Sequence, residues 1–242
     1  EKMPQQQATL DTYTPPAQST QTSSEQSAAA YMLGRPAAFA FLFMWALPSS
    51  FIPLYMKTLY SPMFGLSKDV VLGLPISLEM LCAMVAALIS GMITDRKGWH
   101  LPFIAGAVFC AAGGLLAASA TDGMTFILSR GITGLGYGLS WMAIQGFIFQ
   151  FSTPSTRARG IANLVAGIVS GQICGTAVGA MLAERLGYSP VFIGSAVLSV
   201  LPLAFILLFM RPYMHKAIDS MKKEKLRLAD IRDLVFNRNY FA

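Results

Sequence analysis

Asp95-Arg96-Lys97-Gly98-Trp99 is a short polar segment between two long apolar runs. A near copy, Glu184-Arg185-Leu186-Gly187-Tyr188, lies between two further apolar runs. The flanks repeat as well, because residues 103–108 align with residues 192–197 at the same offset. Three apolar runs fit into one period, and an odd number of membrane crossings inverts the second copy relative to the first. The repeated segment therefore predicts membrane helices arranged as an inverted repeat.

The composition also favours a membrane protein. Of the 242 residues, 54% are hydrophobic and only 12% are charged, whereas a soluble domain carries about 25% charged residues. The apolar runs each approach the ~20 residues that a helix needs to cross a bilayer, and the backbone of a crossing must satisfy its own hydrogen bonds. We expect an all-α membrane protein with six transmembrane helices in a 3+3 inverted repeat. The runs cover residues 37–57, 70–93, 101–120, 124–149, 160–183 and 188–210.

The two ends of the chain differ from the bundle, which we place at residues 35–211. Residues 1–34 are mostly small and polar, with few large aliphatic side chains. Such a segment cannot bury enough apolar surface to order itself, so we expect a disordered polar tail or a linker from an upstream domain. Residues 212–242 are basic and loosely amphipathic. We expect a cytoplasmic linker on the membrane surface, which runs into a seventh span.

The basic residues indicate orientation. With a cytoplasmic N-terminus, the outer loops hold only Lys57, Lys68 and Arg185, and the remaining lysines and arginines outside the spans lie inside. The positive-inside rule therefore places both ends in the cytoplasm, and we expect a multi-pass protein of the plasma (cell inner) membrane. The positive-inside distribution accounts for the net charge of +6. We therefore expect no nucleic-acid partner. No catalytic or metal-binding motif occurs, so we expect no enzyme activity, cofactor or metal.

Two charged residues lie well inside spans: Glu79 in the second and Arg130 in the fourth. An ionised residue at that depth costs several kcal/mol unless it is paired or wetted, and such residues are candidates for function. Glu79 either carries a proton or stays ionised beside a cation or Arg130. Arg130 either binds an anionic substrate or responds to protonation of Glu79. A fixed structural ion pair is the alternative to all these roles.

Other polar residues in the spans are candidates to line a path for a solute. Their alternative role is interhelical hydrogen bonding, which is the common use of single hydroxyls and amides in membrane helices. Prolines in the first two runs allow bends around a cavity. The candidate lining residues are Ser49, Ser50, Tyr55, Tyr137, Trp141, Gln145, Asn163 and Gln172.

A stripe of small residues follows one side of the fifth run. Residues four apart stack along a helix, and a strip without side chains admits another backbone to close range. Static helix packing and a sliding contact between two halves of a larger protein are both open. The stripe consists of Asn163, Gly167, Gly171, Gly175 and Gly179.

Three motifs occur in order along these runs. They are Gly91-Met92-Ile93-Thr94-Asp95-Arg96-Lys97-Gly98 after the second run, Arg130-x-x-x-Gly134-x-Gly136 in the fourth, and Gly171-x-x-x-Gly175-Thr176-x-x-Gly179 in the fifth. The set resembles the G-x-x-x-D-R-x-G loop and two further motifs of the major facilitator superfamily, the last of them associated with antiporters. The chain departs from these motifs where Trp99 and His100 replace basic residues and Thr176 replaces proline.

The resemblance implies the N-terminal six-helix half of a twelve-span transporter, with a C-terminal half as its partner. It implies alternating access driven by an ion gradient, with proton-coupled efflux of a small organic solute by antiport. Uptake by symport, or a membrane sensor or anchor fused to an upstream domain, are the alternatives. Gly91, Asp95, Arg96 and Gly98 would form a gating loop in which Asp95 latches onto the other half. The alternative is a solvated turn charge.

Overall fold

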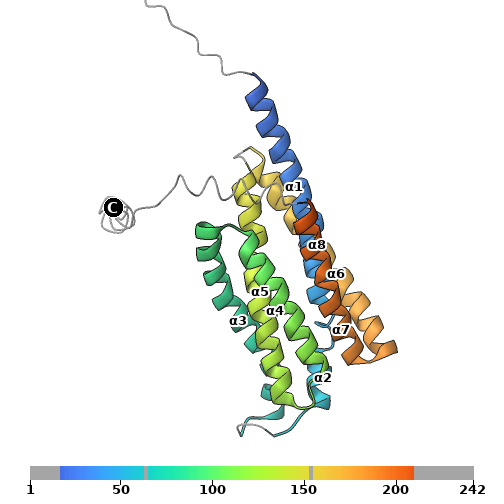
Figure 1. The fold of residues 1–242 in the computed structure, drawn as a ribbon. Coiled ribbons are helices and arrows are strands. Elements are labelled where there is room, and N and C mark those ends of the chain that lie inside the picture. The colour runs from blue at the N-terminus through green and yellow to red at the C-terminus, as the bar shows by residue number, and fades with distance from the viewer. Residues whose placement is uncertain (1–16, 63–64, 153–154, 210–242) are drawn as a thin grey trace, which may run out of the picture.

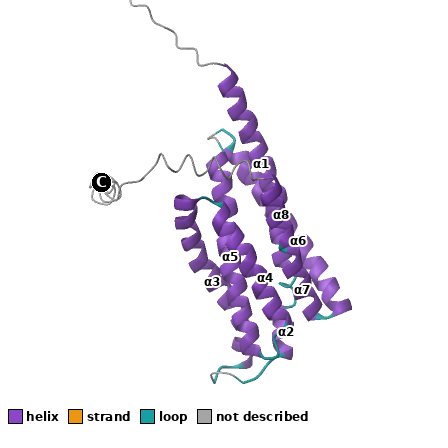
Figure 2. Cartoon of the chain, in the orientation of Figure 1, coloured by secondary structure: helices purple, strands orange, loops and turns teal. Residues whose placement is uncertain are grey.

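The computed structural model describes residues 17–62, 65–152 and 155–209. All the regular secondary structure in this part of the chain is helical (Figure 1; Figure 2). The helices are α1 (Ala17–Ala46), α2 (Ile52–Thr58), α3 (Lys68–Lys97), α4 (His100–Ala118), α5 (Gly123–Phe151), α6 (Arg157–Leu186), α7 (Tyr188–Leu198) and α8 (Val200–Phe209). The expected all-α fold is confirmed for these residues. Residues 1–16 of the expected tail and the expected linker at 212–242 lie outside the described part.

The first and last apolar runs are each divided, which differs from the continuous spans expected there. In the first, α1 ends at Ala46 and α2 begins at Ile52, with Pro48 in the intervening turn. In the last, Ser199 separates α7 from α8. Pro202 has no N–H to donate to the carbonyl four residues earlier, so the hydrogen-bond ladder is interrupted there.

Helix α1 also begins earlier than the sequence predicted. Residues 17–34, which we assigned to a polar tail, form the N-terminal part of α1. Alanine, glutamine and glutamate in this segment are good helix formers. Extending an existing helix avoids the cost of nucleation, so the apolar second half of α1 is sufficient to continue the helix outward.

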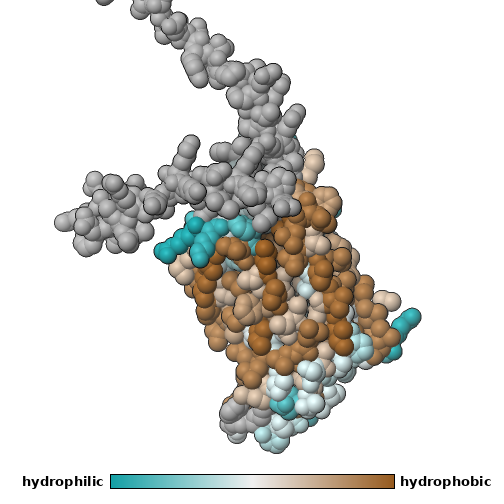
Figure 3. Space-filling view, viewed as in Figure 1, coloured by the Kyte–Doolittle hydropathy of each residue, from teal (hydrophilic) through white to brown (hydrophobic). Residues whose placement is uncertain are grey.

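Five segments of the described chain are long and apolar enough to cross a membrane: α3, α4, α5, α6 and Tyr188–Phe209, which contains both α7 and α8. Met32–Ala46 is also apolar but shorter. Apolar side chains cover the middle of the visible face, with hydrophilic residues toward its two ends (Figure 3). The helices therefore form a multi-pass membrane bundle.

Most of the helix packing joins one copy of the repeat to the other, rather than helices within one copy. Helix α5 packs along α3 and α4, α6 packs along α1, and α4 meets α7. Helices α3 and α6 are both 30 residues long and are related by the offset that separates Asp95 from Glu184. They run in opposite directions through the bundle (Figure 1).

The two repeated turns share one backbone geometry. Gly98 ends α3 with φ 92° and ψ 157°, and Gly187 ends α6 with φ 86° and ψ 176°. Residues other than glycine rarely adopt this region. The backbone thus explains why glycine occurs at the same place in both copies of the motif.

Alanine at either turn should be destabilising. We expect Gly98→Ala and Gly187→Ala each to lower the free energy of unfolding by roughly 1–3 kcal/mol, because both force a side chain into a glycine-only conformation. Chemical unfolding of the purified full-length variants measures this. Gly91→Ala is the control, since an added Cβ there meets nothing within 4 Å. Equal stability of the Gly98 and Gly91 variants would refute the explanation.

Asp122 determines where α5 begins. Its carboxylate accepts hydrogen bonds from the Thr125 backbone N–H at 2.9 Å and from the Thr125 hydroxyl at 2.7 Å. These bonds favour the charged carboxylate and hold the pKa of Asp122 below its ordinary value. The cap fixes the register of the helix that carries Arg130.

Candidate functional site

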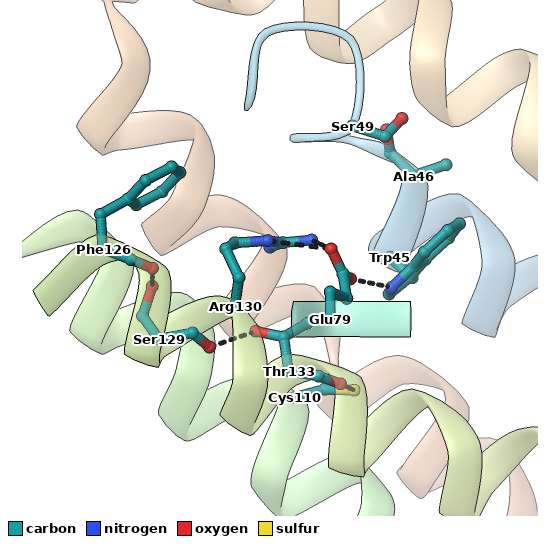
Figure 4. Close-up of polar contacts among 9 residues, drawn as sticks. All are labelled: Trp45, Ala46, Ser49, Glu79, Cys110, Phe126, Ser129, Arg130 and Thr133. Carbon is teal, nitrogen blue, oxygen red and sulfur yellow. Dashed lines mark hydrogen bonds and ion pairs between the residues drawn. The ribbon is translucent and has the colours of Figure 1, made fainter. Parts of the chain in front are cut away.

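Glu79 on α3 and Arg130 on α5 form a buried ion pair (Figure 4). Each residue is only 1% exposed. The Arg130 Nε donates to Glu79 Oε2 at 3.1 Å, and Arg130 Nη2 donates to the same oxygen. The pairing that the sequence left open is therefore present. Breaking such a pair leaves an uncompensated charge in an apolar interior.

Trp45 on α1 completes this site, and sequence reasoning missed it. Its indole N–H donates to Glu79 Oε1 at 2.9 Å, so both carboxylate oxygens have a partner and three helices converge on one side chain (Figure 4). A signal was available, because a buried indole N–H usually finds a partner. The sequence alone did not indicate which polar group would face it.

Glycines in α5 bring its backbone against α3 at the ion pair. A Cβ at Gly134 would overlap the Glu79 backbone, and one at Gly138 would overlap the Ala83 carbonyl. Close approach of two helices at small residues is common in membranes. Gly134 and Arg130 both belong to the second motif. This motif therefore supplies the close contact between α5 and α3 and also the arginine that pairs with Glu79.

A ladder of aromatic rings starts at Trp45. The Trp45 and Tyr137 rings stack with centroids 4.4 Å apart, and Tyr137 stacks on Trp141 at 5.7 Å. All three side chains are half-buried. Trp141 also lines a groove of about 320 Å³ between α5 and α6, to which Gln145 contributes an amide among apolar side chains. Tyr137, Trp141 and Gln145, expected to line a cavity, thus lie along one continuous surface.

The remaining candidate lining residues do not gather around this surface. Tyr55 is a correction: it is 7% exposed, packs in an apolar cluster and donates to the Ala120 carbonyl at 3.2 Å. Ser49 donates to the Ala46 carbonyl at 2.6 Å and lies 3.3 Å from the Thr176 hydroxyl. Ser50 has a buried hydroxyl oxygen with no hydrogen-bond partner. Gln172 is exposed on α6.

The glycine stripe of α6 packs against α1. Added Cβ atoms at Gly167, Gly171, Gly175 and Gly179 would collide in turn with the carbonyl oxygens of Arg35, Phe39, Phe43 and Leu47. Four-residue spacing on one helix therefore matches four-residue spacing on the other. Asn163 is only half-buried, and Leu164 is the buried residue at that level. Because α1 occupies this face, the packing role of the stripe is the one that the structure supports.

The four residues of the expected gating loop lie at the end of α3. Asp95 and Arg96 are exposed, whereas Gly98 is buried in the turn. Gly91 has open space where a Cβ would lie, so no other described helix approaches it closely. Trp99 is fully buried beside Phe147, with ring centroids 4.8 Å apart. The turn is thus anchored by an aromatic side chain where the motif carries a basic residue.

The site offers a buried carboxylate whose charged form is stabilised by an arginine and an indole, beside a half-exposed aromatic surface. The described residues contain no group of three His, Cys, Asp or Glu side chains that could hold a metal ion.

The fold and the site define a multi-pass helical membrane protein with a charged pair in its interior. The family model of the Major Facilitator Superfamily matches residues 36–241. The chain therefore belongs to the Major Facilitator Superfamily, as its three motifs suggested.

Among curated proteins, the chain is similar to proteins named multidrug resistance protein MdtG. It is 28% identical over 193 residues to the one from Salmonella dublin, with 77% of this chain and 45% of that protein covered. It is 29% identical over 194 residues to the one from Enterobacter lignolyticus, with 77% and 44% covered. The chain thus spans less than half the length of these relatives.

Proposed function

We propose that this chain is the N-terminal half of a secondary transporter that exports a small organic solute in exchange for protons. The observation that carries the proposal is the buried Glu79–Arg130 pair, in which one member can bind a proton. Family membership and the name of the relatives, multidrug resistance protein, favour export. We place transport at the interface with a second, C-terminal half, by movement of the two halves around a site between them.

The proposed topology is six spans in a 3+3 inverted repeat with both ends in the cytoplasm. Opposite directions of α3 and α6 and their equal lengths support the inversion (Figure 1). Arg96 and Lys97 end α3 and Arg157 begins α6, so these basic residues lie at the same end of the bundle. The positive-inside rule makes that end cytoplasmic, in a plasma or inner membrane.

In the proposed mechanism, Glu79 alternates between an ionised and a protonated form. The ionised form accepts hydrogen bonds from Arg130 and Trp45, which link α5 and α1 to α3. Protonation removes the charge that Arg130 compensates, so the bond between α3 and α5 weakens. A proton gradient can thereby bias the bundle between two arrangements, provided that they differ in their affinity for the proton.

Asp95 has the second role in this proposal. It is exposed at the end of α3, where a helix N-terminus from the C-terminal half can donate hydrogen bonds to its carboxylate. This contact would hold one state of the transporter closed. Trp99 supports it by anchoring the turn in the core.

The double variant Glu79→Gln/Arg130→Gln tests the coupling. Neutral amides can keep hydrogen bonds across the pair while removing the group that titrates, so the fold is retained. We expect the full-length double variant in liposomes to exchange solute down its gradient but to lose accumulation driven by a proton gradient by at least roughly tenfold. Transport of candidate solutes with and without an imposed pH difference measures both activities.

Transport measurements on the wild-type protein separate the alternatives. Efflux that requires an opposing proton gradient supports antiport, whereas uptake that requires a parallel gradient indicates symport. No counterflow of any solute by the wild type would favour a sensor or anchor. Full proton-driven accumulation by the double variant would remove Glu79 from the mechanism.

A further inference from the structure

A second groove lies between α3 and α4. Both helices pack along α5 but make few contacts with each other, so a channel is left between them, with Leu135 and Leu139 of α5 at its base. The volume of this groove is about 500 Å³, and its lining is apolar except for Lys97. Such a volume falls within the roughly 300–1,000 Å³ of sites that bind small molecules.

The groove has the length of one lipid chain. It follows α3 from Lys97, at the end of the helix, inward to Ala86. At about 1.5 Å per residue these two residues are about 16 Å apart along the axis, close to half of the ~30 Å thickness of a hydrocarbon core. The lining residues Ile89, Leu101 and Phe109 are 42%, 43% and 40% exposed, so no other described element covers them.

Positive charge is confined to one end of the groove. Lys97 is exposed there, and no ion pair that involves it occurs among the described residues. The neighbouring Asp95 and Arg96 carry opposite charges, so the end of α3 keeps a net positive charge. Helix α4 begins at His100, directly after the turn, and the positive end of its dipole also favours an anion. An apolar groove with a cation at the membrane surface is complementary to a lipid with an anionic headgroup.

We propose that this groove binds one molecule of an anionic phospholipid. An acyl chain lies along the groove and covers its exposed apolar side chains, while the Lys97 ammonium donates hydrogen bonds to the headgroup phosphate. Basic pockets between transmembrane helices are known to bind anionic headgroups in this way. The bound chain also fills the space between α3 and α4. The proposed topology places the lipid in the cytoplasmic leaflet, whereas the binding itself depends on neither the direction nor the coupling of transport.

Native mass spectrometry of the full-length protein, stripped of lipid, tests the proposal. Phosphatidylglycerol and phosphatidylcholine with the same palmitoyl chains are the probes, because only the first carries a net negative charge. We expect phosphatidylglycerol to bind at least roughly fivefold tighter, the size expected for one lysine at a membrane surface. Phosphatidylglycerol with hexanoyl chains should bind at least roughly tenfold more weakly than the palmitoyl lipid, since it buries far fewer methylene groups. Equal affinity for the two palmitoyl lipids overturns the proposal.

Two charge variants locate the headgroup. Lys97→Gln removes the charge from an exposed side chain that the core does not need, and should abolish the preference for phosphatidylglycerol. Arg159→Gln is the matched control, because Arg159 is an exposed basic residue of α6 that does not line the groove. It should keep the preference. If Lys97→Gln keeps the full preference, Lys97 does not hold the headgroup and the proposal fails.

Two alanine replacements locate the acyl chain. Ala105 is half-buried and lines the groove, so Ala105→Leu places a larger side chain where the lipid chain would lie. It should weaken the binding of both palmitoyl lipids by at least roughly threefold. Ala112→Leu makes the same change at an exposed position of α4 outside the groove, and should bind both lipids as the wild type does. Equal binding by the two variants would show that the chain lies elsewhere, or that another part of the full-length protein covers the groove, and would overturn the proposal.

Discussion

Replacing Arg130 alone by glutamine should lower the free energy of unfolding by roughly 3–5 kcal/mol, the usual cost of breaking a buried ion pair. Both side chains are 1% exposed, so neither charge can turn to water. Glu79→Gln should cost at least as much, because a carboxylate can bind a proton when isolated whereas the guanidinium stays charged. Denaturant unfolding of the full-length protein, followed by tryptophan fluorescence, measures both variants.

The double variant Glu79→Gln/Arg130→Gln is the decisive comparison. Replacing both charges by neutral groups that still hydrogen bond should recover most of the loss, since no charge is left uncompensated. Losses that simply add in the double variant would mean that the two residues act independently and that their contact contributes little.

Alanine in the glycine stripe of α6 should be the second most damaging change. At Gly175 and Gly179 an added Cβ would collide with the carbonyl oxygens of Phe43 and Leu47. A backbone atom cannot rotate away, so α1 and α6 must separate. We expect each variant to lose about 3 kcal/mol, the upper end of the usual cost of overpacking. Denaturant unfolding and the yield of folded full-length protein measure the effect.

Gly73→Ala is the matched control for the stripe. Gly73 also lies inside a helix, α3, but an added Cβ there meets nothing within 4 Å. Alanine is the better helix former by about 1 kcal/mol, so this variant should be as stable as the wild type or slightly more stable. Similar losses at Gly73 and Gly179 would show that flexibility of the backbone, rather than contact with α1, explains the glycines.

The sequence predicted the features that depend on local geometry. Gly98 and Gly187 end their helices in the same conformation because that backbone shape accepts little else. The glycine stripe was recognised from its four-residue spacing, although the sequence did not indicate that α1 was its partner. The sequence left open whether Glu79 pairs with Arg130, because a contact between their faces depended on how α3 and α5 rotate against each other.

Prolines show why the interruptions were harder to foresee. Pro36 and Pro75 lie inside α1 and α3, which continue through them, whereas Pro48 lies in the turn that ends α1. The same residue removes the same hydrogen bond in each case. Neighbouring helices determine whether the backbone continues, and this tertiary context is absent from the local sequence. Trp45 was missed for the same reason, since its partner lies on another helix.

The pairing of α1 with α6 has a consequence for biosynthesis. When α1 enters the membrane, the helix that will cover its Arg35 to Phe43 face has not been made, because α3, α4 and α5 are synthesised first. The nascent chain must hold this face against lipid until α6 arrives. Assembly of the bundle should therefore be a late event, and truncation before α6 should produce an inserted but loosely associated intermediate that membrane proteases can remove.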